Sequence, residues 1–312
     1  MAAEPVLAHR TANRWRVWGY WLLPGEGFSY LLHLRPREWP IVAAHTALGF
    51  LLASGLDLAG GGGWGSLLLA LACWVFFLNG GTLALNSVFD RDRGDIGYLD
   101  APPPPPPYLL AFASGLLAGG QLLALLLPPL FALAYALCLG LSVLYSVPPF
   151  RWKAVGGLDL LINAVGFGAL TPLAGWAATG RPLAAHAVWL FVAFGFLFAG
   201  FYPLTQLYQL EEDQERGDRT FAMLVGGARP SLGVALASVG AAFGAFGAAL
   251  ARAPLPRLPV LLLLALAAWL AVLLPWAVRA EETSPEGHKR GMYAALYCWA
   301  LTDLVVLVAF VR

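Results

Sequence analysis

Long apolar runs, separated by short polar segments, make up most of the chain. Each run has the roughly 20 residues that a helix needs to cross the hydrocarbon core of a bilayer. Nine such runs lie at 39–56, 64–89, 108–127, 129–147, 158–178, 186–208, 231–251, 258–279 and 291–311. Only Pro128-Pro129 divides the third run from the fourth, which predicts a tight helical hairpin. The pattern therefore predicts an all-α, polytopic membrane protein with nine transmembrane helices.

Composition agrees with a membrane protein. The chain is 59% hydrophobic and 12% charged, about half the charged fraction of soluble domains. Its net charge of +1 offers no electrostatic basis for binding nucleic acid. Cys73, Cys138 and Cys298 lie far apart in apolar runs, which favours buried apolar side chains over a disulfide or a metal site.

The basic residues predict the orientation. Fifteen of the 19 Lys and Arg residues lie in the N-terminal segment and in the loops after the second, fourth, sixth and eighth runs. Cytoplasmic loops of membrane proteins carry such an excess. We therefore expect an integral protein of the cell or inner membrane, with its N-terminus in the cytoplasm and its C-terminus outside. Because the N-terminus lacks the apolar core of a signal peptide, the first span is expected to be retained.

Residues 1–38 are expected to form a separate cytoplasmic or interfacial segment before a single transmembrane domain at 39–312. Arginines alternate with tryptophan and tyrosine between Arg10 and Trp21. That mixture is typical of a segment lying at the level of the lipid headgroups, although an unstructured tail fits it equally well.

A first polar cluster ends the second run. Asn86 and Asp90 are four residues apart and so share one helical face. Gly94 is a predicted helix stop, so Asp95 would approach that face from a loop, and Asp92 lies two residues before the stop. Carboxylate and amide oxygens are the ligands that Mg²⁺ prefers. A solvated loop of alternating charges, with arginines among the acids, is the competing interpretation.

A second polar cluster ends the sixth run. Gln209, Glu212, Asp213 and Arg216 recur at the spacing of one helical face, and Gly217 is a predicted stop. The second and sixth runs cross in the same direction, so both clusters should meet one membrane surface. Together they predict a paired metal site.

Between the clusters lie two further polar groups. Arg151 and Lys153, after the fourth run, could neutralise a polyanion. Asp159 and Asn163, four residues apart, begin the fifth run. Because all these stripes are confined to cytoplasmic ends, we expect a central cavity with a charged mouth on the cytoplasmic side. A matching ligand has a diphosphate head and a hydrocarbon tail.

These segments resemble the UbiA superfamily of intramembrane prenyltransferases. Asn86 and Asp90 match its first motif, Asn-x-x-x-Asp-x-x-x-Asp, whose third acid falls on Gly94 here, with Asp92 and Asp95 nearby. Gln209 and Asp213 match its second motif, Asp-x-x-x-Asp, in which Gln209 replaces an acid and Glu212 is a candidate for the missing charge. A connecting segment is matched by Tyr145, Ser146, Arg151 and Lys153.

The resemblance implies transfer of a prenyl group from a prenyl diphosphate to an aromatic or lipid-like acceptor in the membrane. Its implied cofactor is Mg²⁺. The implied metal ligands are Asn86, Asp90, Asp92, Asp95, Gln209, Glu212 and Asp213, and the implied catalytic residues are Asp90, Asp213 and Lys153. The implied substrate-binding residues are Asn86, Tyr145, Ser146, Arg151, Lys153, Asp159 and Asn163.

Two other functional classes compete with prenyl transfer. Acids in membrane segments also suit an ion-coupled transporter, although here they cluster at one surface in parallel rather than inverted repeats. A scaffold could use the proline run 102–107, but a simple spacer explains that run as well. His45 and Asp303 lie inside predicted spans and are expected to make hydrogen bonds between helices.

Overall fold

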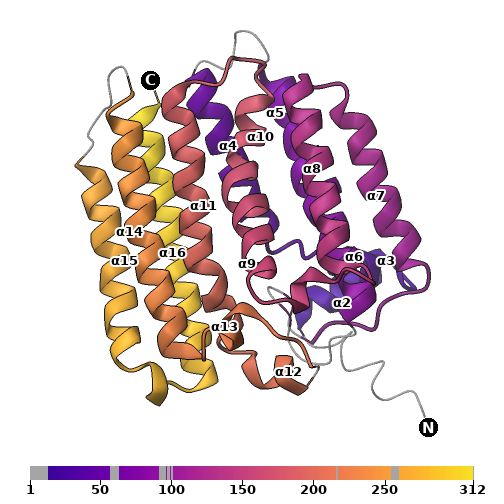
Figure 1. Ribbon diagram of the computed structural model, residues 1–312. Coiled ribbons are helices and arrows are strands. Elements are labelled where there is room, and N and C mark those ends of the chain that lie inside the picture. Colours follow the sequence, from indigo (N-terminus) through magenta and orange to yellow (C-terminus); the bar gives the residue numbers. More distant parts are fainter. Residues whose placement is uncertain are drawn as a thin grey trace.

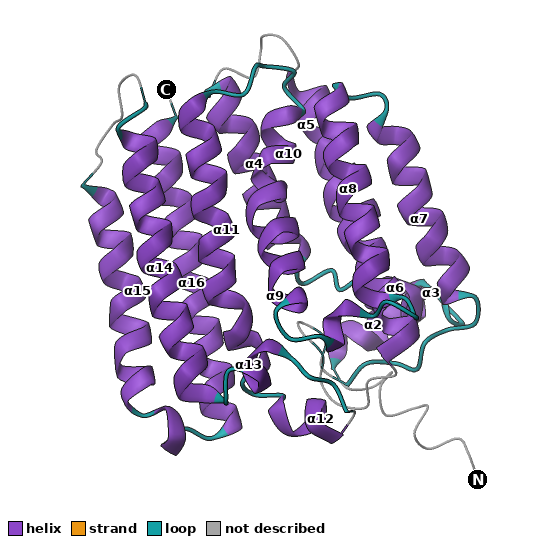
Figure 2. Ribbon diagram, viewed as in Figure 1, coloured by secondary structure: helices purple, strands orange, loops and turns teal. Residues whose placement is uncertain are grey.

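The computed structural model describes residues 13–56, 63–90, 96, 99, 101–215, 217–253 and 260–311, and of Glu212 only the backbone. Within these ranges the chain folds into an upright bundle of helices and forms no strand (Figures 1 and 2). The predicted all-helical fold is therefore confirmed.

The helices, in chain order, are α2 (Arg14–Leu22), α3 (Gly27–His33), α4 (Trp39–Ser54), α5 (Gly63–Leu71), η1 (Ala72–Gly80), α6 (Gly81–Asp90), α7 (Leu109–Ala124), α8 (Pro129–Ser146), η2 (Trp152–Ala154), α9 (Leu158–Asn163), η3 (Ala164–Leu170), α10 (Thr171–Ala177), α11 (Ala185–Gln206), α12 (Leu210–Glu215), α13 (Phe221–Leu224), α14 (Ala228–Leu250), α15 (Leu261–Val278), η4 (Ala280–Glu282) and α16 (Pro285–Phe310). Segments η1 and η3 are π-helical turns inside the continuous helices 63–90 and 158–177.

Each predicted apolar run contains a helix. In the described ranges, seven helices are long and apolar enough to cross a membrane. Helices α4 and α7 are apolar but have only 16 residues each, about 24 Å of rise against a hydrocarbon core of about 30 Å. An integral membrane protein is confirmed, and the count of nine spans stays a prediction.

Helix ends follow local sequence signals. Pro129 and Pro285 occupy the first turns of α8 and α16, where a missing N–H costs nothing. The Ser284 hydroxyl accepts a hydrogen bond from the Gly287 N–H at 3.2 Å and caps α16. Gly217 follows α12 with a φ of +75°, a conformation that favours glycine, so the stop predicted there is present.

Helices α4 and α10 form the seam between two hydrophobic cores. One core gathers α11, α14, α15 and α16, and the other gathers α5 to α8 (Figure 1). On α4, Leu48 and Phe50 belong to different cores. Glycines allow the crossing, because a Cβ at Gly49 would lie 1.8 Å from the Pro172 carbonyl oxygen and one at Gly175 would lie 1.9 Å from that of Thr46.

A polar contact joins the seam to the last helix. His45 Nδ1 on α4 lies 3.1 and 3.2 Å from the two carboxylate oxygens of Asp303 on α16. Both side chains are buried or nearly so, at 4% and 14% exposed. The hydrogen bond between helices that was predicted for these residues is therefore present.

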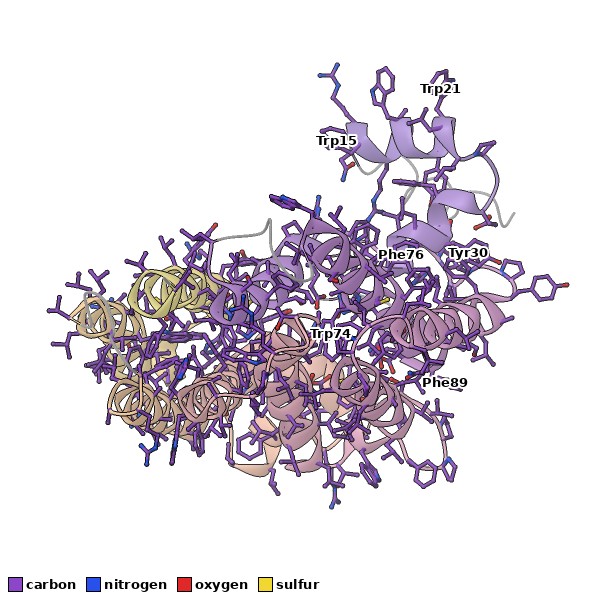
Figure 3. All side chains as sticks on the ribbon, turned by 90° about the horizontal axis from the view of Figure 1, so that it is seen from above. Trp15, Trp21, Tyr30, Trp74, Phe76 and Phe89 are labelled. Carbon is purple, nitrogen blue, oxygen red and sulfur yellow. The ribbon has the colours of Figure 1, made fainter. Side chains whose placement is uncertain are left out.

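The N-terminal segment is helical and projects sideways from the bundle (Figure 3). On α2, Trp15, Trp18 and Trp21 are 82%, 62% and 73% exposed, as expected of a helix at the headgroup level. The described part of this segment is therefore no unstructured tail, and its boundary at residue 38 stays a prediction.

The proline run packs against that segment. Arg16 Nη1 donates to the Ala101 carbonyl oxygen at 2.6 Å, and the Tyr30 hydroxyl donates to the Pro107 carbonyl oxygen. The run is thus held at both ends by side chains of α2 and α3.

The glycine crossing generates the first testable prediction. Gly49→Ala should force α4 and α10 apart and lower the free energy of unfolding by about 1–3 kcal/mol, the usual cost of overpacking. The loss of stability is measured as a lower midpoint of thermal unfolding in detergent, followed by tryptophan fluorescence. Gly140→Ala on α8 is the matched control, because a Cβ there meets nothing within 4 Å. Equal midpoints for the two variants would contradict the tight crossing.

Candidate functional site

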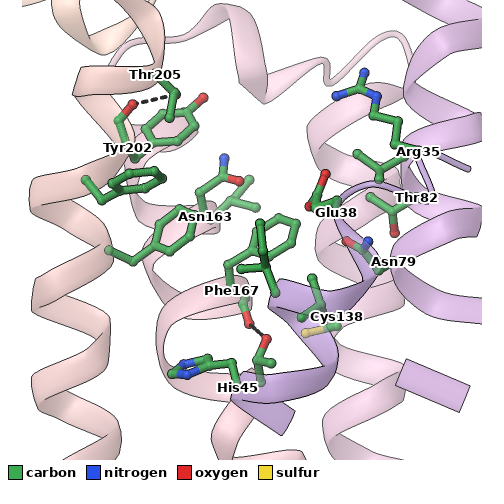
Figure 4. A pocket seen from close by; sticks show the side chains of 18 of the residues that line it. Arg35, Glu38, His45, Asn79, Thr82, Cys138, Asn163, Phe167, Tyr202 and Thr205 are labelled. Carbon is green, nitrogen blue, oxygen red and sulfur yellow. Dashed lines mark hydrogen bonds between the residues drawn. The ribbon is translucent and has the colours of Figure 1, made fainter. Parts of the chain in front are cut away.

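Two adjoining pockets lie between the two cores. The larger one, here called the apolar cavity, has a volume of about 280 Å³ and is lined mainly by hydrophobic side chains of α4, η1, α6, α8, η3, α11 and α16 (Figure 4). The smaller one, here called the head pocket, has a volume of about 200 Å³. It is lined by Arg35, Asn86, Asp90, Ile96, Tyr145, Lys153, Tyr202, Thr205, Gln206, Tyr208, Gln209, Asp213, Asp218 and Thr220.

The pockets share part of their walls, so they form one continuous site. The shared residues are Arg35, Asn86, Tyr145, Tyr202, Thr205 and Tyr208. A molecule with a charged head in the head pocket can therefore extend its tail into the apolar cavity. This is the charged mouth and apolar body that the sequence predicted.

The head pocket brings together both predicted polar clusters. The end of α6 contributes Asn86 and Asp90, and the segment around α12 contributes Gln209 and Asp213. Lys153 on η2 completes the wall. They meet because α6 and α11 end at the same end of the bundle, where α12 and α13 also lie (Figure 1).

Opposite charges face each other in the head pocket. The Lys153 ammonium forms an ion pair with the Asp90 carboxylate, and the two side chains are 10% and 7% exposed. Arg151 does not line the pocket. Its Nη1 lies 3.1 Å from the carboxylate of Asp218, which does. Lys153 and Asp90 are both buried, so each charge is stable there only while the other compensates it.

Asp159 holds the fold together and lines neither pocket. Its buried carboxylate accepts hydrogen bonds from the backbone N–H groups of Gly157, Leu160 and Phe221 and from Nε2 of Gln206, at 2.7–2.9 Å. In turn, Gln206 Oε1 accepts from the Ala222 N–H at 2.9 Å. This network fastens α9, α11 and α13 to one another.

Two other predicted residues, Asn163 and Ser146, lie nearer the pockets than Asp159 does. Asn163 lines the apolar cavity and donates to the Asp159 carbonyl oxygen at 2.8 Å. Ser146 is fully buried, and its hydroxyl donates to Asn86 Oδ1 at 3.3 Å. Ser146 thereby orients Asn86 rather than lining either pocket.

Two charged residues of the site that lie just before the first apolar run were missed by the sequence reasoning. Arg35 lines both pockets and Glu38 lines the apolar cavity. Burial raises the pKa of the Glu38 carboxyl from 4.5 to about 7, while the Arg35 charge and the Asn79 amide oppose that rise. The sequence signal for both residues is a charge directly before an apolar run. In the structure, Arg35 also has a positive φ of 49°.

The described residues fit a magnesium site. Asp90 and Asp213 contribute carboxylates to the head pocket, and Asn86 and Gln209 contribute amide oxygens. No cluster of three or more His, Cys, Asp or Glu residues suited to a metal occurs in the described part of the chain. Mg²⁺ does not require one, because it commonly takes one or two carboxylates together with substrate phosphates. The candidate ligands Asp92, Asp95 and the Glu212 side chain lie outside the described residues.

Comparison with known proteins agrees with this arrangement. The UbiA prenyltransferase family matches residues 42–299. A lycopene elongase/hydratase of Haloarcula japonica is 31% identical over 215 residues, which cover 64% of this chain and 67% of that protein.

Solved structures share the fold. A UbiA homolog from Archaeoglobus fulgidus bound to DMAPP and Mg²⁺ is 20% identical, with a TM-score of 0.66, over 89% of this chain and 99% of that one. A digeranylgeranylglyceryl phosphate synthase is 18% identical, with a TM-score of 0.69, over 91% of this chain and 98% of that one. The match over most of the chain shows that this protein is a member of the UbiA prenyltransferase family.

Proposed function

We propose that the chain transfers a prenyl group, in a Mg²⁺-dependent reaction, from a prenyl diphosphate to a lipid-like acceptor held in the membrane. The continuity of the head pocket with the apolar cavity carries this proposal. A diphosphate needs the charged part of the site and its prenyl tail needs the apolar part.

The head pocket supplies the groups that a diphosphate requires. Lys153 and Arg35 line it and can donate charge-assisted hydrogen bonds to phosphate oxygens. The metal ion would be held by Asn86, Asp90, Gln209 and Asp213, and it would supply positive charge to a departing diphosphate. Arg151 acts indirectly, because its contact with Asp218 holds one wall of the pocket.

The apolar cavity supplies the environment that an allylic cation requires. Phe167 and Phe198 stack with their ring centroids 5.5 Å apart, and both line the cavity. Aromatic faces stabilise a nearby cation. Hydrophobic walls also keep out the water that would otherwise hydrolyse it.

The acceptor that we favour is an isoprenoid hydrocarbon. The relative from Haloarcula japonica is named for its action on lycopene, and the walls of the apolar cavity are mainly hydrophobic. We further propose that the head pocket faces the cytoplasm. Support comes from the basic residues, which the sequence concentrates in the loops on that side.

The test is an assay of the protein in lipid nanodiscs with Mg²⁺. Dimethylallyl, geranyl and geranylgeranyl diphosphate serve as donors, and lycopene, quinone precursors and polar lipids serve as acceptors. We expect Mg²⁺-dependent release of diphosphate together with a prenylated isoprenoid hydrocarbon. Release that does not depend on a divalent ion would overturn the proposed role of the head pocket.

The carboxylates of the head pocket generate a second prediction. Asp90→Asn and Asp213→Asn should each slow turnover by about a hundredfold or more. Each substitution removes a carboxylate that would hold the metal ion, and a bound metal ion stabilises the charge of the transition state by several kcal/mol. Asp213→Asn should also raise the Mg²⁺ concentration needed for half-maximal rate. Diphosphate release, with Mg²⁺ titrated, measures both effects. Glu215→Gln, an exposed carboxyl of the same helix as Asp213, is the control expected to match wild type. An unchanged Mg²⁺ requirement in Asp213→Asn would mean that this segment binds no metal.

Gln209 generates a third prediction, because it stands where the family motif has an acid. Gln209→Asp should retain activity and lower the half-saturating Mg²⁺ concentration by about threefold to tenfold, up to about 1.4 kcal/mol of binding free energy. Gln214→Asp makes the same change at an exposed position nearby that lines neither pocket. If both variants shifted the Mg²⁺ requirement equally, general surface charge rather than ligation would explain the effect.

A further inference from the structure

Glu38 occupies a distinctive place in the apolar cavity. Among the described residues that line this cavity, it is the only carboxyl. Its side chain is buried, with 9% of the residue exposed. Figure 4 shows it between Arg35 and Asn79 on one wall, with Asn163 across the cavity.

The backbone holds Glu38 firmly without using its side chain. The Glu38 N–H donates to the Arg35 carbonyl oxygen at 2.9 Å, and the Glu38 carbonyl oxygen accepts from Ile41 and Val42 at the start of α4. Although Glu38 occupies the N-cap position, its carboxyl makes no capping hydrogen bond to the helix. Capping the start of α4 therefore does not explain why a carboxyl stands at this position.

The position of Glu38 relative to the two pockets suits a reaction with the transferred prenyl group. The reacting carbon is bonded to the diphosphate, so it must lie where the head pocket meets the apolar cavity. Arg35 lines both pockets at that junction. Glu38 follows Arg35 by three residues, across a turn that precedes α4, and lines only the apolar cavity. Its carboxyl is thus beside the hydrocarbon side of the junction.

Three other titratable groups of the cavity are held by partners elsewhere in the protein. His45 pairs with Asp303 through Nδ1, and its Nε2 lies 3.4 Å from the Gly168 carbonyl oxygen. The hydroxyls of Tyr145 and Tyr202 lie 3.0 Å apart and bind each other. His45 also lies at the opposite end of the drawn cavity from Thr205, a residue of the junction (Figure 4).

We propose that Glu38 is the general base that removes the proton at the end of prenyl transfer. This inference rests on the proposed function. The carbon–oxygen bond of the prenyl diphosphate breaks and its electron pair leaves with the diphosphate. A π bond of the acceptor supplies the electrons of the new carbon–carbon bond, which leaves a cation on the acceptor. An adjacent C–H bond then becomes a new double bond, and its proton goes to a Glu38 carboxylate oxygen.

The acidity of Glu38 suits this step. With a pKa raised to about 7, the carboxylate and its acid form are both populated at neutral pH, as is best for a general base. Arg35, before α4, and Asn79, on η1, act directly on its carboxyl. The Asp90–Lys153 pair lies in the adjoining head pocket. The other titratable residues that line the cavity are His45, Cys138, Tyr145, Tyr202, Tyr208 and Tyr293. Since the carboxylate is the active form, turnover should rise with pH through about 7 and then level off.

The decisive experiment compares product formation with diphosphate release in nanodiscs, using dimethylallyl diphosphate and lycopene from pH 5.5 to 8.5. In Glu38→Gln we expect prenylated alkene to fall by about a hundredfold or more, while the KM for the diphosphate stays unchanged. Diphosphate release should exceed alkene formation, because water captures the cation as an alcohol. The rise of rate with pH near 7 should disappear. Glu26→Gln, an exposed carboxyl outside both pockets, should behave as wild type.

Two further measurements separate a catalytic role from a structural one. Because the pKa of Glu38 is raised in the folded protein, folding favours its protonated form. The contribution of Glu38 to the free energy of unfolding is therefore fully present below about pH 4.5 and is lost as the pH rises through about 7. Glu38→Gln should therefore unfold at pH 8 no earlier than wild type. Glu38→Asp keeps the carboxyl but withdraws it by one methylene, so it should retain the pH dependence and lose about tenfold in kcat.

Different results would overturn the proposed role of Glu38 and the proposed prenyl transfer. If Glu38→Gln couples alkene formation to diphosphate release as wild type does, the proton has another acceptor and the inference is wrong. Should Glu38→Gln fail to fold, an unaltered kcat in Glu38→Asp would overturn it instead. A wild-type protein that releases no diphosphate with any donor and acceptor would overturn the proposed function itself.

Discussion

The buried carboxylate of Asp159 is the interaction on which the site most depends. Four donors from α9, α11 and the segment entering α13 converge on it. A buried charge that accepts several hydrogen bonds is stable, whereas each donor left unpaired would cost about 1–3 kcal/mol. Through Gln206, the same network sets one wall of the head pocket. The Asp159 network therefore positions the wall of the head pocket that α11 and Thr220, just before α13, supply.

Most of the fold could be predicted from the sequence because hydropathy is a local property. Each apolar run forms a helix, and the spacing of Asn86 and Asp90 places both on one wall of the head pocket. Glycine at position 217 and proline at positions 129 and 285 marked helix ends through their own backbone preferences.

Tertiary partners could not be predicted in this way. Asp159 and Asn163 share a helical face, but only the fold shows that their roles differ. The Asp159 carboxylate accepts hydrogen bonds from donors elsewhere in the chain, while Asn163 lines the cavity. Arg35 and Glu38 were missed because an apolar run begins just after them, and charges beside a run ordinarily face water. The π-helical turns were also missed, since an extra residue in a helix leaves an apolar run unchanged.

One of those π-helical turns, η1, determines which way the first motif faces. It lies in a continuous helix between α5, whose Leu67 and Ala70 pack in the core, and α6, which carries Asn86 and Asp90. Each residue of an α-helix turns the chain by about 100°. A π-helical turn takes up one residue more than an α-helical turn. If the same residues formed an uninterrupted α-helix, Asn86 and Asp90 would therefore be rotated by about 100° relative to the packed half of the helix. The direction in which the first motif faces thus depends on a backbone feature that leaves the hydropathy profile unchanged.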